Sequence, residues 1–183
     1  WIAPALARQA IRDALGRTWW GSVDIERVEI NLTEPLLVAG VSLKDTSGQE
    51  WLRTGDIRIH LRNWPGLNPV LEEVHVDWVR LSGRFQDGRF ALPLRQDRPP
   101  SDEPVDASGA AEYLDVRRVT IGRIDLSVAI GRDYFVQSDP LIFELRRGED
   151  GYQFDLTRLD PAGRGGPLVS GTLDEAGAEV EIV

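Results

Sequence analysis

Two histidines, His60 and His75, are the side chains best suited to acid–base or metal chemistry in this chain. Each lies between apolar residues in an alternating segment, and this pattern predicts that both rings point to the polar side of a β-sheet. If the two segments pair as a hairpin around residues 63–70, the rings come close together. Two histidines without a nearby set of carboxylates are a weak metal signal, and two exposed sheet residues are the simpler interpretation.

The other residue types that support catalysis are missing or poorly placed. The chain contains no cysteine, which excludes disulfides, thiolate catalysis and cysteine-ligated metal sites. The glycines of residues 163–166 indicate a turn rather than a phosphate-binding loop, and no G-x-S-x-G segment is present. Asp102, Glu103 and Asp106 lie in a proline-rich segment, where nothing would hold them in a fixed geometry. We therefore expect a protein that is not an enzyme and that has no cofactor and no metal.

The chain has six tryptophans, and their positions allow three interpretations. We expect Trp51 and Trp78 to pack in the core. Trp19, Trp20 and Trp64 could instead offer flat faces on which a sugar stacks. The tryptophans that flank the first helical segment could equally mark a membrane-interface belt.

One segment, residues 4–17, has the apolar periodicity of an amphipathic helix. Pro4 suits the first turn of this helix, and Gly16 is expected to end it. We expect Leu6, Ala10 and Leu15 to face either a sheet or a membrane.

Most of the remaining chain alternates apolar and polar residues, a pattern typical of strands with one buried face. The alternation is clear in residues 57–61, 74–78 and 124–130, and it continues in residues 141–145 and 152–156. From the first three of these segments we expect the following residues to line the apolar face: Ile57, Ile59, Leu61, Val74, Val76, Trp78, Ile124, Leu126 and Val128.

Turn signals and a faint internal repeat add detail to this β pattern. Asp87-Gly88 would place Phe85 opposite Phe90 in a two-residue hairpin, and residues 150–151 could turn in the same way. Residues 23–30 and 114–121 align without gaps and share Asp, Arg, Val and Ile at four positions. In both copies the apolar phase slips by one residue, which predicts a bulge or bend in each.

One stretch does not fit the β pattern. Residues 95–111 hold three prolines, four acidic residues and a single large apolar residue, a composition typical of a mobile linker. We therefore expect the chain to divide into residues 1–94, a helix with a first β unit, residues 95–112, a mobile linker or loop, and residues 113–183, a second β unit that continues the sheet.

A sheet with one apolar face must bury that face, and one helix cannot cover all of it. The sequence therefore predicts a mainly β fold: a bent, open antiparallel sheet with an apolar concave face and one N-terminal α-helix. A closed β-sandwich is the alternative. The 21 basic and 30 acidic residues give a formal net charge of −9, which argues against nucleic acid as a partner.

Three stretches of the sequence resemble the superfamily of bacterial envelope proteins that includes AsmA, TamB and YhdP. The pattern VDIERVEINL…LLVAGVSLKD in residues 23–45 is similar to the two opening strands of that family. Residues 52–93 and 114–173 are similar to its later strands, the last ending in GGPLVSGTL. The matching patterns are strands and turns, and they cover most of the chain except the linker.

The resemblance implies a fold, a location and a function. Proteins of this family are tethered to the inner membrane by an N-terminal helix, project into the periplasm, and form taco-shaped β-grooves with an apolar interior. On this basis we expect an N-terminal groove module that holds phospholipid acyl chains for transport between the inner and outer membranes. Its anchor would lie upstream of the present sequence.

Two other interpretations stay open at this stage. The module could be a periplasmic scaffold for outer-membrane assembly without lipid cargo, because an open sheet edge can pair with following repeats or with a partner protein. A carbohydrate-binding sandwich that uses Trp19, Trp20 or Trp64 is the third interpretation.

Overall fold

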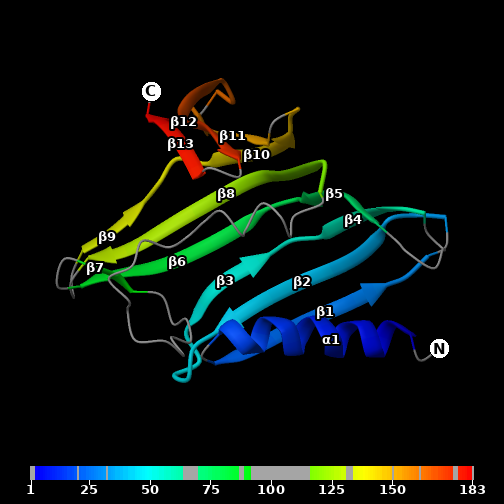
Figure 1. Ribbon diagram of the computed structural model, residues 1–183. Helices are drawn as coiled ribbons and strands as arrows, with labels where there is room; N and C mark the ends of the chain where they lie inside the picture. The colour runs from blue at the N-terminus through cyan, green and yellow to red at the C-terminus, as the bar shows by residue number, and fades with distance from the viewer. Residues whose placement is uncertain are drawn as a thin grey trace.

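A computed structural model describes residues 3–19, 21–31, 33–63, 70–86, 89–91, 116–130, 134–149, 151–160, 162–174 and 177–182. Within these residues the chain forms one helix and thirteen strands (Figure 1). Their bounds are α1 Ala3–Thr18, β1 Ser22–Glu29, β2 Leu36–Lys44, β3 Glu50–Thr54, β4 Ile57–Arg62, β5 Val70–Val76, β6 Val79–Gln86, β7 Arg89–Ala91, β8 Arg118–Ile130, β9 Tyr134–Gln137, β10 Leu141–Arg147, β11 Tyr152–Leu159, β12 Gly165–Asp174 and β13 Gly177–Ile182.

All the described strands belong to one sheet, in the order β13-β12-β11-β10-β8-β5-β4-β2-β3-β6-β7, with β1 paired to β2 and β9 paired to β8. The predicted mainly β fold with a single N-terminal helix is therefore confirmed. The sheet is mixed rather than purely antiparallel, because β8 runs parallel to both β5 and β6. The described strands do not divide into the two sheets of a closed sandwich.

The two β-rich halves of the sequence meet at β8. Its first residues pair with β5 and its later residues pair with β6, so the strands of the two halves join in one continuous sheet at β8. The predicted linker, residues 95–112, lies outside the described residues.

A line of strand interruptions crosses the sheet, and we call this line the crease. The strands β3 and β4 both pair with β2, in the same register on either side of the break, so together they form one strand line broken at Gly55 and Asp56. The register shifts only next to Lys44, at the far end of β3. In the same way β5 and β6 form one strand line broken at Asp77 and Trp78. The two breaks lie side by side, because the Gly55 amide donates to the Trp78 carbonyl at 2.9 Å and the Asp77 amide donates to the Asp56 carbonyl at 3.0 Å.

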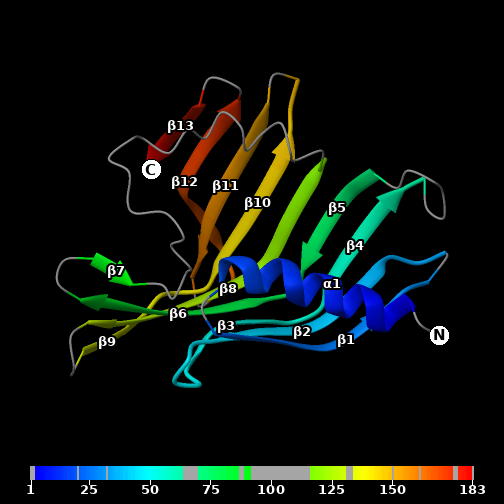
Figure 2. The same cartoon turned by 60° about the horizontal axis from the view of Figure 1, so that its bottom comes forward.

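The crease continues into β2 at Gly40, whose φ of 59° is a left-handed value that favours glycine. A Cβ at Gly40 would lie 2.3 Å from the Cδ of Glu26, so the side chain of Glu26 occupies the space that this glycine leaves open. Figure 2 shows the result: β4, β5 and β10 to β13 rise away from β3, β6 and β9, and α1 lies on the inner side of the bend. We call this inner side of the sheet the concave face.

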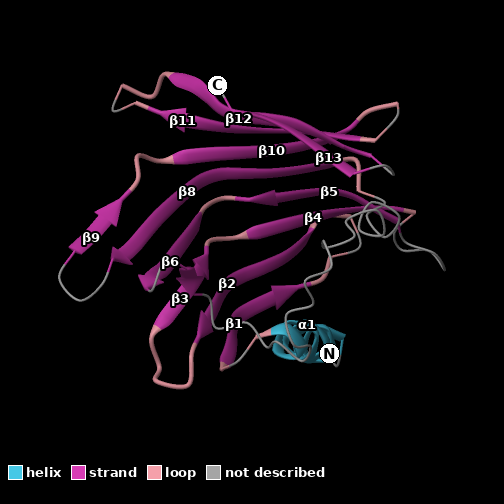
Figure 3. Cartoon of the chain, turned by 60° about the vertical axis from the view of Figure 1, so that its left-hand side comes forward, coloured by secondary structure: helices cyan, strands magenta, loops and turns pink. Residues whose placement is uncertain are grey.

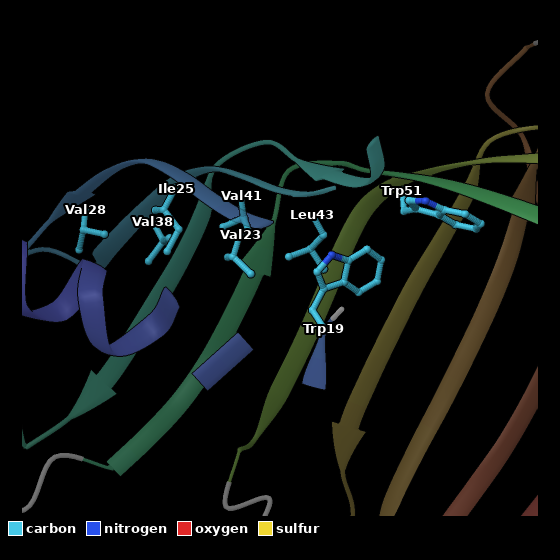
Figure 4. Packing of buried hydrophobic residues seen from close by; sticks show 8 residues of the cluster. All are labelled: Trp19, Val23, Ile25, Val28, Val38, Val41, Leu43 and Trp51. Carbon is cyan, nitrogen blue, oxygen red and sulfur yellow. The ribbon is translucent and has the colours of Figure 1, made fainter. Parts of the chain in front are cut away.

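The hydrophobic core lies between α1 and the concave side of β1, β2 and β3 (Figure 4). Ala7, Ile11 and Leu15 of the helix pack against it. Of the three residues predicted to face a sheet or a membrane, Leu15 packs against the sheet, whereas Leu6 is 63% exposed and Ala10 is also exposed, so these two do not face the sheet. The following residues form the core: Trp19, Val23, Ile25, Val28, Val38, Val41, Leu43 and Trp51.

The helix does not end at Gly16, as the sequence predicts, but continues to Thr18. A backbone hydrogen bond of 3.0 Å from the Trp19 amide to the Leu15 carbonyl extends its last turn. The Trp19 indole, which follows directly, lies in the core, where its Nε1 donates to the Lys44 carbonyl at 2.8 Å. A buried ring cannot stack on a sugar, so the interpretation of Trp19 as a stacking surface is wrong. Trp20 and Trp64 lie outside the described residues.

One predicted hairpin is confirmed, because Phe85 pairs with Phe90, as a two-residue turn at residues 87–88 requires. The chain also turns where residues 150–151 were expected to turn, but the β10–β11 connection is longer. It spans residues 148–151, and the Gly148 amide donates to the Gly151 carbonyl at 2.7 Å.

Burial follows the phase slip of the sequence in both copies of the repeat. Ile25 and Val28 are buried with two exposed residues between them. Buried Val116 and half-buried Val119 are separated in the same way.

Candidate binding site on the concave face

An unbroken row of large apolar residues crosses nine strands of the concave face, from β1 to β13. Each member is the direct register partner of the next, so the row runs perpendicular to the strands. With neighbouring strands about 4.8 Å apart, the row is about 38 Å long. Its members are Val28, Val38, Ile57, Val76, Ile121, Phe143, Leu156, Val169 and Ile182.

A second row lies beside the first and extends from β2 to β13. One member of this row, Gly171, has no side chain. The ring of its register partner Phe154 occupies the space beside it, because a Cβ at Gly171 would lie 2.5 Å from the Phe154 Cζ. The members of this row are Leu36, Ile59, Val74, Val119, Leu145, Phe154, Gly171 and Val180.

Exposure rises along both rows. At the β2 end Val38 is only 2% exposed, because the core under α1 includes it. In the middle, residues of β8, β10 and β11 are half-buried. At the β13 end Val180 is 55% exposed and Ile182 is 83% exposed. Figure 3 shows why: α1 lies beside β1 at one end of the sheet, and β11 to β13 lie at the other. The rows therefore run from a closed core to an open apolar surface.

A further apolar patch lies on the other side of the crease, where β6, β8 and β9 meet. Ile124, Leu126 and Val128 pair in register with Val79, Leu81 and Gly83 of β6. Leu81 pairs in turn with Leu52 and so connects this patch to the core residue Leu43. At the outer end Val128 pairs with the exposed Val136.

Eight of the nine predicted lining residues lie on the concave face. Ile57 and Val76 belong to the first row, Ile59 and Val74 belong to the second, and Leu61 pairs with Leu71 next to it. The other three form the patch on β8. The eight are not equivalent, because Ile57 and Ile59 pack against the core under α1.

Trp78 is the exception, and the prediction for it is wrong. The crease shifts the phase of the strand between Val76 and Val79, so Trp78 turns to the opposite, polar face. There its indole lies against Gly55, and the Arg80 guanidinium lies 5.9 Å from the ring centroid. The alternation of residues 74–78 holds only as far as Val76.

The sequence prediction also omitted the half of the two rows that lies on β10 to β13. Phe143, Leu145, Phe154 and Leu156 alternate with polar residues just as the chosen segments do. This alternation is the signal from which these four residues could have been predicted to line the concave face. What the sequence does not carry is the strand order that places these residues in line with Val76 and Val74.

The polar face opposite the concave face carries both histidines, as predicted. In the β4–β5 pair His75 lies opposite Arg58 and His60 lies opposite Glu73. The His75 ring lies 2.7 Å from the Thr120 hydroxyl through Nδ1 and 3.3 Å from Asp77 through Nε2. Arg58 donates two hydrogen bonds to the Asp77 carboxylate, at 2.7 and 3.3 Å.

Arg58, Asp77, His75 and Thr120 therefore form one connected polar group on this face. Beside them, Glu144 of β10 lies between Arg146 of the same strand and Arg118 of β8, and their hydrogen bonds and charge hold the pKa of Glu144 below its usual value. No group of three metal-ligating side chains occurs among the residues that the structure describes.

No family model, curated protein or solved structure matches the chain. Among the described residues, α1 is too short and too polar to cross a membrane.

Proposed function

We propose that this chain is the N-terminal β-groove module of an AsmA-like envelope protein, and that its concave face holds phospholipid acyl chains for transport between the inner and outer membranes. The observation that supports this best is the pair of apolar rows, which leave the core and continue to an exposed edge. Each methylene group that a ligand buries there contributes about 0.8 kcal/mol, so acyl chains need no specific polar anchor.

The position of α1 indicates where an acyl chain would lie. The core under α1 already takes up the rows at β1, β2 and β4, because it includes Val28 and Val38, and Ile57 and Ile59 pack against it. From β5 to β13 the rows extend about 24 Å at a strand spacing of about 4.8 Å. Half of a bilayer hydrocarbon core is about 15 Å thick, so this open part is long enough for an acyl chain.

The remaining parts of the proposal come from the resemblance to the AsmA-like family. They are the periplasmic location and the tether to the inner membrane through an upstream helix. In this arrangement the lipid headgroup stays in water while the chains lie on the concave face, and no enzymatic step is involved.

Native mass spectrometry of the protein, expressed in bacteria and purified without detergent, tests the lipid proposal. Phe154→Asp places a charge in the second row on β11, while Gln153→Asp places the same charge on the polar face of the same strand. We expect bound phospholipid in the wild type and in Gln153→Asp, and its loss in Phe154→Asp, because a charge beside acyl chains is costly to desolvate. Circular dichroism verifies that both variants are folded.

A folded, monodisperse wild type that carries no lipid would contradict the lipid proposal. Equal lipid occupancy in the two variants would also contradict it. In either case the scaffold interpretation, in which the module binds only protein partners, would become the leading one.

A further inference from the structure

A hydroxyl, an imidazole and a carboxylate form one hydrogen-bonded chain on the polar face. His75 lies between the other two groups, with Nδ1 at 2.7 Å from the Thr120 Oγ1 and Nε2 at 3.3 Å from the Asp77 Oδ1. This is the order of groups that activates a serine or threonine nucleophile in acyl transfer. The chain therefore has the parts of a nucleophilic site, although nothing in the lipid proposal uses them.

Asp77 determines which nitrogen of the His75 ring carries the proton. A carboxylate only accepts hydrogen bonds, so Nε2 donates to Asp77 and the neutral ring has its lone pair on Nδ1. The Thr120 hydroxyl then donates to Nδ1, which is the direction that a general base requires. Arg58 fixes the Asp77 carboxylate with two hydrogen bonds, at 2.7 and 3.3 Å.

The sheet holds these groups beside an open hollow. His75 and Thr120 are direct register partners in the parallel β5–β8 pair, and both line a hollow of about 450 Å³. Arg118 also lines it, two residues before Thr120 on the same face of β8. Its contacts with Glu144 use Nε and Nη2, which leaves Nη1 to stabilise negative charge on a substrate oxygen.

We propose that Thr120 is a nucleophile that takes an acyl group from an activated carboxylic ester, with His75 as the general base and Asp77 as a positioning residue. The Thr120 oxygen bonds to the carbonyl carbon of the ester, and the bond from that carbon to the leaving oxygen breaks. The hydroxyl proton moves to Nδ1 of His75 and then to the leaving oxygen, which returns the ring to its neutral form. The site lies on the face opposite the apolar rows, so this test and the lipid test can fail independently.

The test treats the whole chain with p-nitrophenyl acetate and follows, by mass spectrometry of peptides after an acid quench, the rate at which an acetyl group appears on residue 120. We expect acetylation of Thr120 in the wild type. Thr120→Ser keeps the hydroxyl and should react within about tenfold of the wild-type rate, whereas Thr120→Val should form no adduct at this position.

The two histidines provide a matched pair of variants. His75→Gln should slow the acetylation of Thr120 at least about a hundredfold, because general-base catalysis contributes that much or more. His60 lines the same hollow but lies opposite Glu73, so His60→Gln should leave the rate within about twofold. Circular dichroism verifies that each variant is folded.

Asp77→Asn tests the positioning role with a spectroscopic readout. The asparagine amide can donate to Nε2, which moves the ring proton to Nδ1 and removes the base from the Thr120 hydroxyl. We expect acetylation to slow by at least about tenfold. Nitrogen NMR shifts of the His75 ring should report the proton on Nε2 in the wild type and on Nδ1 in the variant.

Three results would overturn this inference. They are a folded wild type in which Thr120 stays unmodified, equal acetylation rates in the wild type and in folded His75→Gln, and a wild-type His75 ring with its proton on Nδ1. The last two of these need different samples, so the ring measurement decides even where His75→Gln does not fold.

Discussion

Asp45 organises the turn between β2 and β3 through a set of hydrogen bonds from a single carboxylate. Its Oδ1 accepts from the Ser47 amide at 2.8 Å, the Ser47 hydroxyl at 2.6 Å and the Gln49 amide at 3.0 Å, and its Oδ2 accepts from the Trp51 indole at 2.8 Å. The Ser47 hydroxyl and the Trp51 indole are the main reasons that the pKa of Asp45 is lowered from 3.8 to about 2. The turn therefore depends on the ionised form of this group.

The dependence on pH follows from the direction of this shift. Because the pKa is lower in the folded state, the stabilisation is complete above pH about 4 and disappears as the pH falls to about 2. We expect Asp45→Asn to have a lower Tm than the wild type above pH 4, and the difference should shrink between pH 4 and pH 2. Thermal unfolding across this range measures it. A difference that stays constant down to pH 2 would show that the carboxylate charge has no role.

Two isoleucines at opposite ends of the sheet have very different surroundings. Ile25 is completely buried under α1, whereas Ile182 is 83% exposed on β13. Ile25→Ala should lower the free energy of unfolding by about 2–5 kcal/mol, and the same substitution at Ile182 should change it by less than about 0.5 kcal/mol. Urea unfolding of both variants measures the contrast. Similar losses at the two positions would show that Ile182 is covered in solution.

At the level of elements, α1 stabilises the sheet through one narrow stripe. Ile11 packs against the core, while Leu6 points to solvent. Ile11→Asp should therefore destabilise the protein by several kcal/mol, since it buries a charge without a partner, and Leu6→Asp should have little effect. Chemical denaturation followed by circular dichroism distinguishes the two. If Ile11→Asp is harmless, the helix is not docked on the sheet in solution.

The elements also show how far the sequence pattern reaches. Apolar periodicity predicted the helix, most of the strands and the face of eight lining residues, because these follow from residues close together in the chain. It placed the end of α1 and the side chain of Trp78 incorrectly. Trp78 lies at the break between β5 and β6, which pairs with the break at Gly55 and Asp56 between β3 and β4. Such a match between segments far apart in the sequence has no local signature.

For the molecule as a whole, strand order was the part that sequence reasoning could not supply. The sequence predicts two β units in series, but nothing in residues 118–130 indicates that β8 pairs in parallel with β5 and β6. The same non-local pairing determines which apolar residues share a row. The candidate site was therefore predictable residue by residue on single strands, and not as a continuous surface.

The position of β8 also has a consequence for how the chain folds. Glu73 pairs with Arg118 and Phe85 pairs with Ile130, so the centre of the sheet can form only after chain segments far apart in sequence have met. A fold with such high contact order pays its loop-closure entropy before the pairing is complete. We expect refolding in the millisecond-to-second range in stopped-flow experiments. The strands that precede β8 in the sequence cannot complete the sheet until β8 pairs with β5 and β6. Refolding within microseconds would contradict this order of assembly.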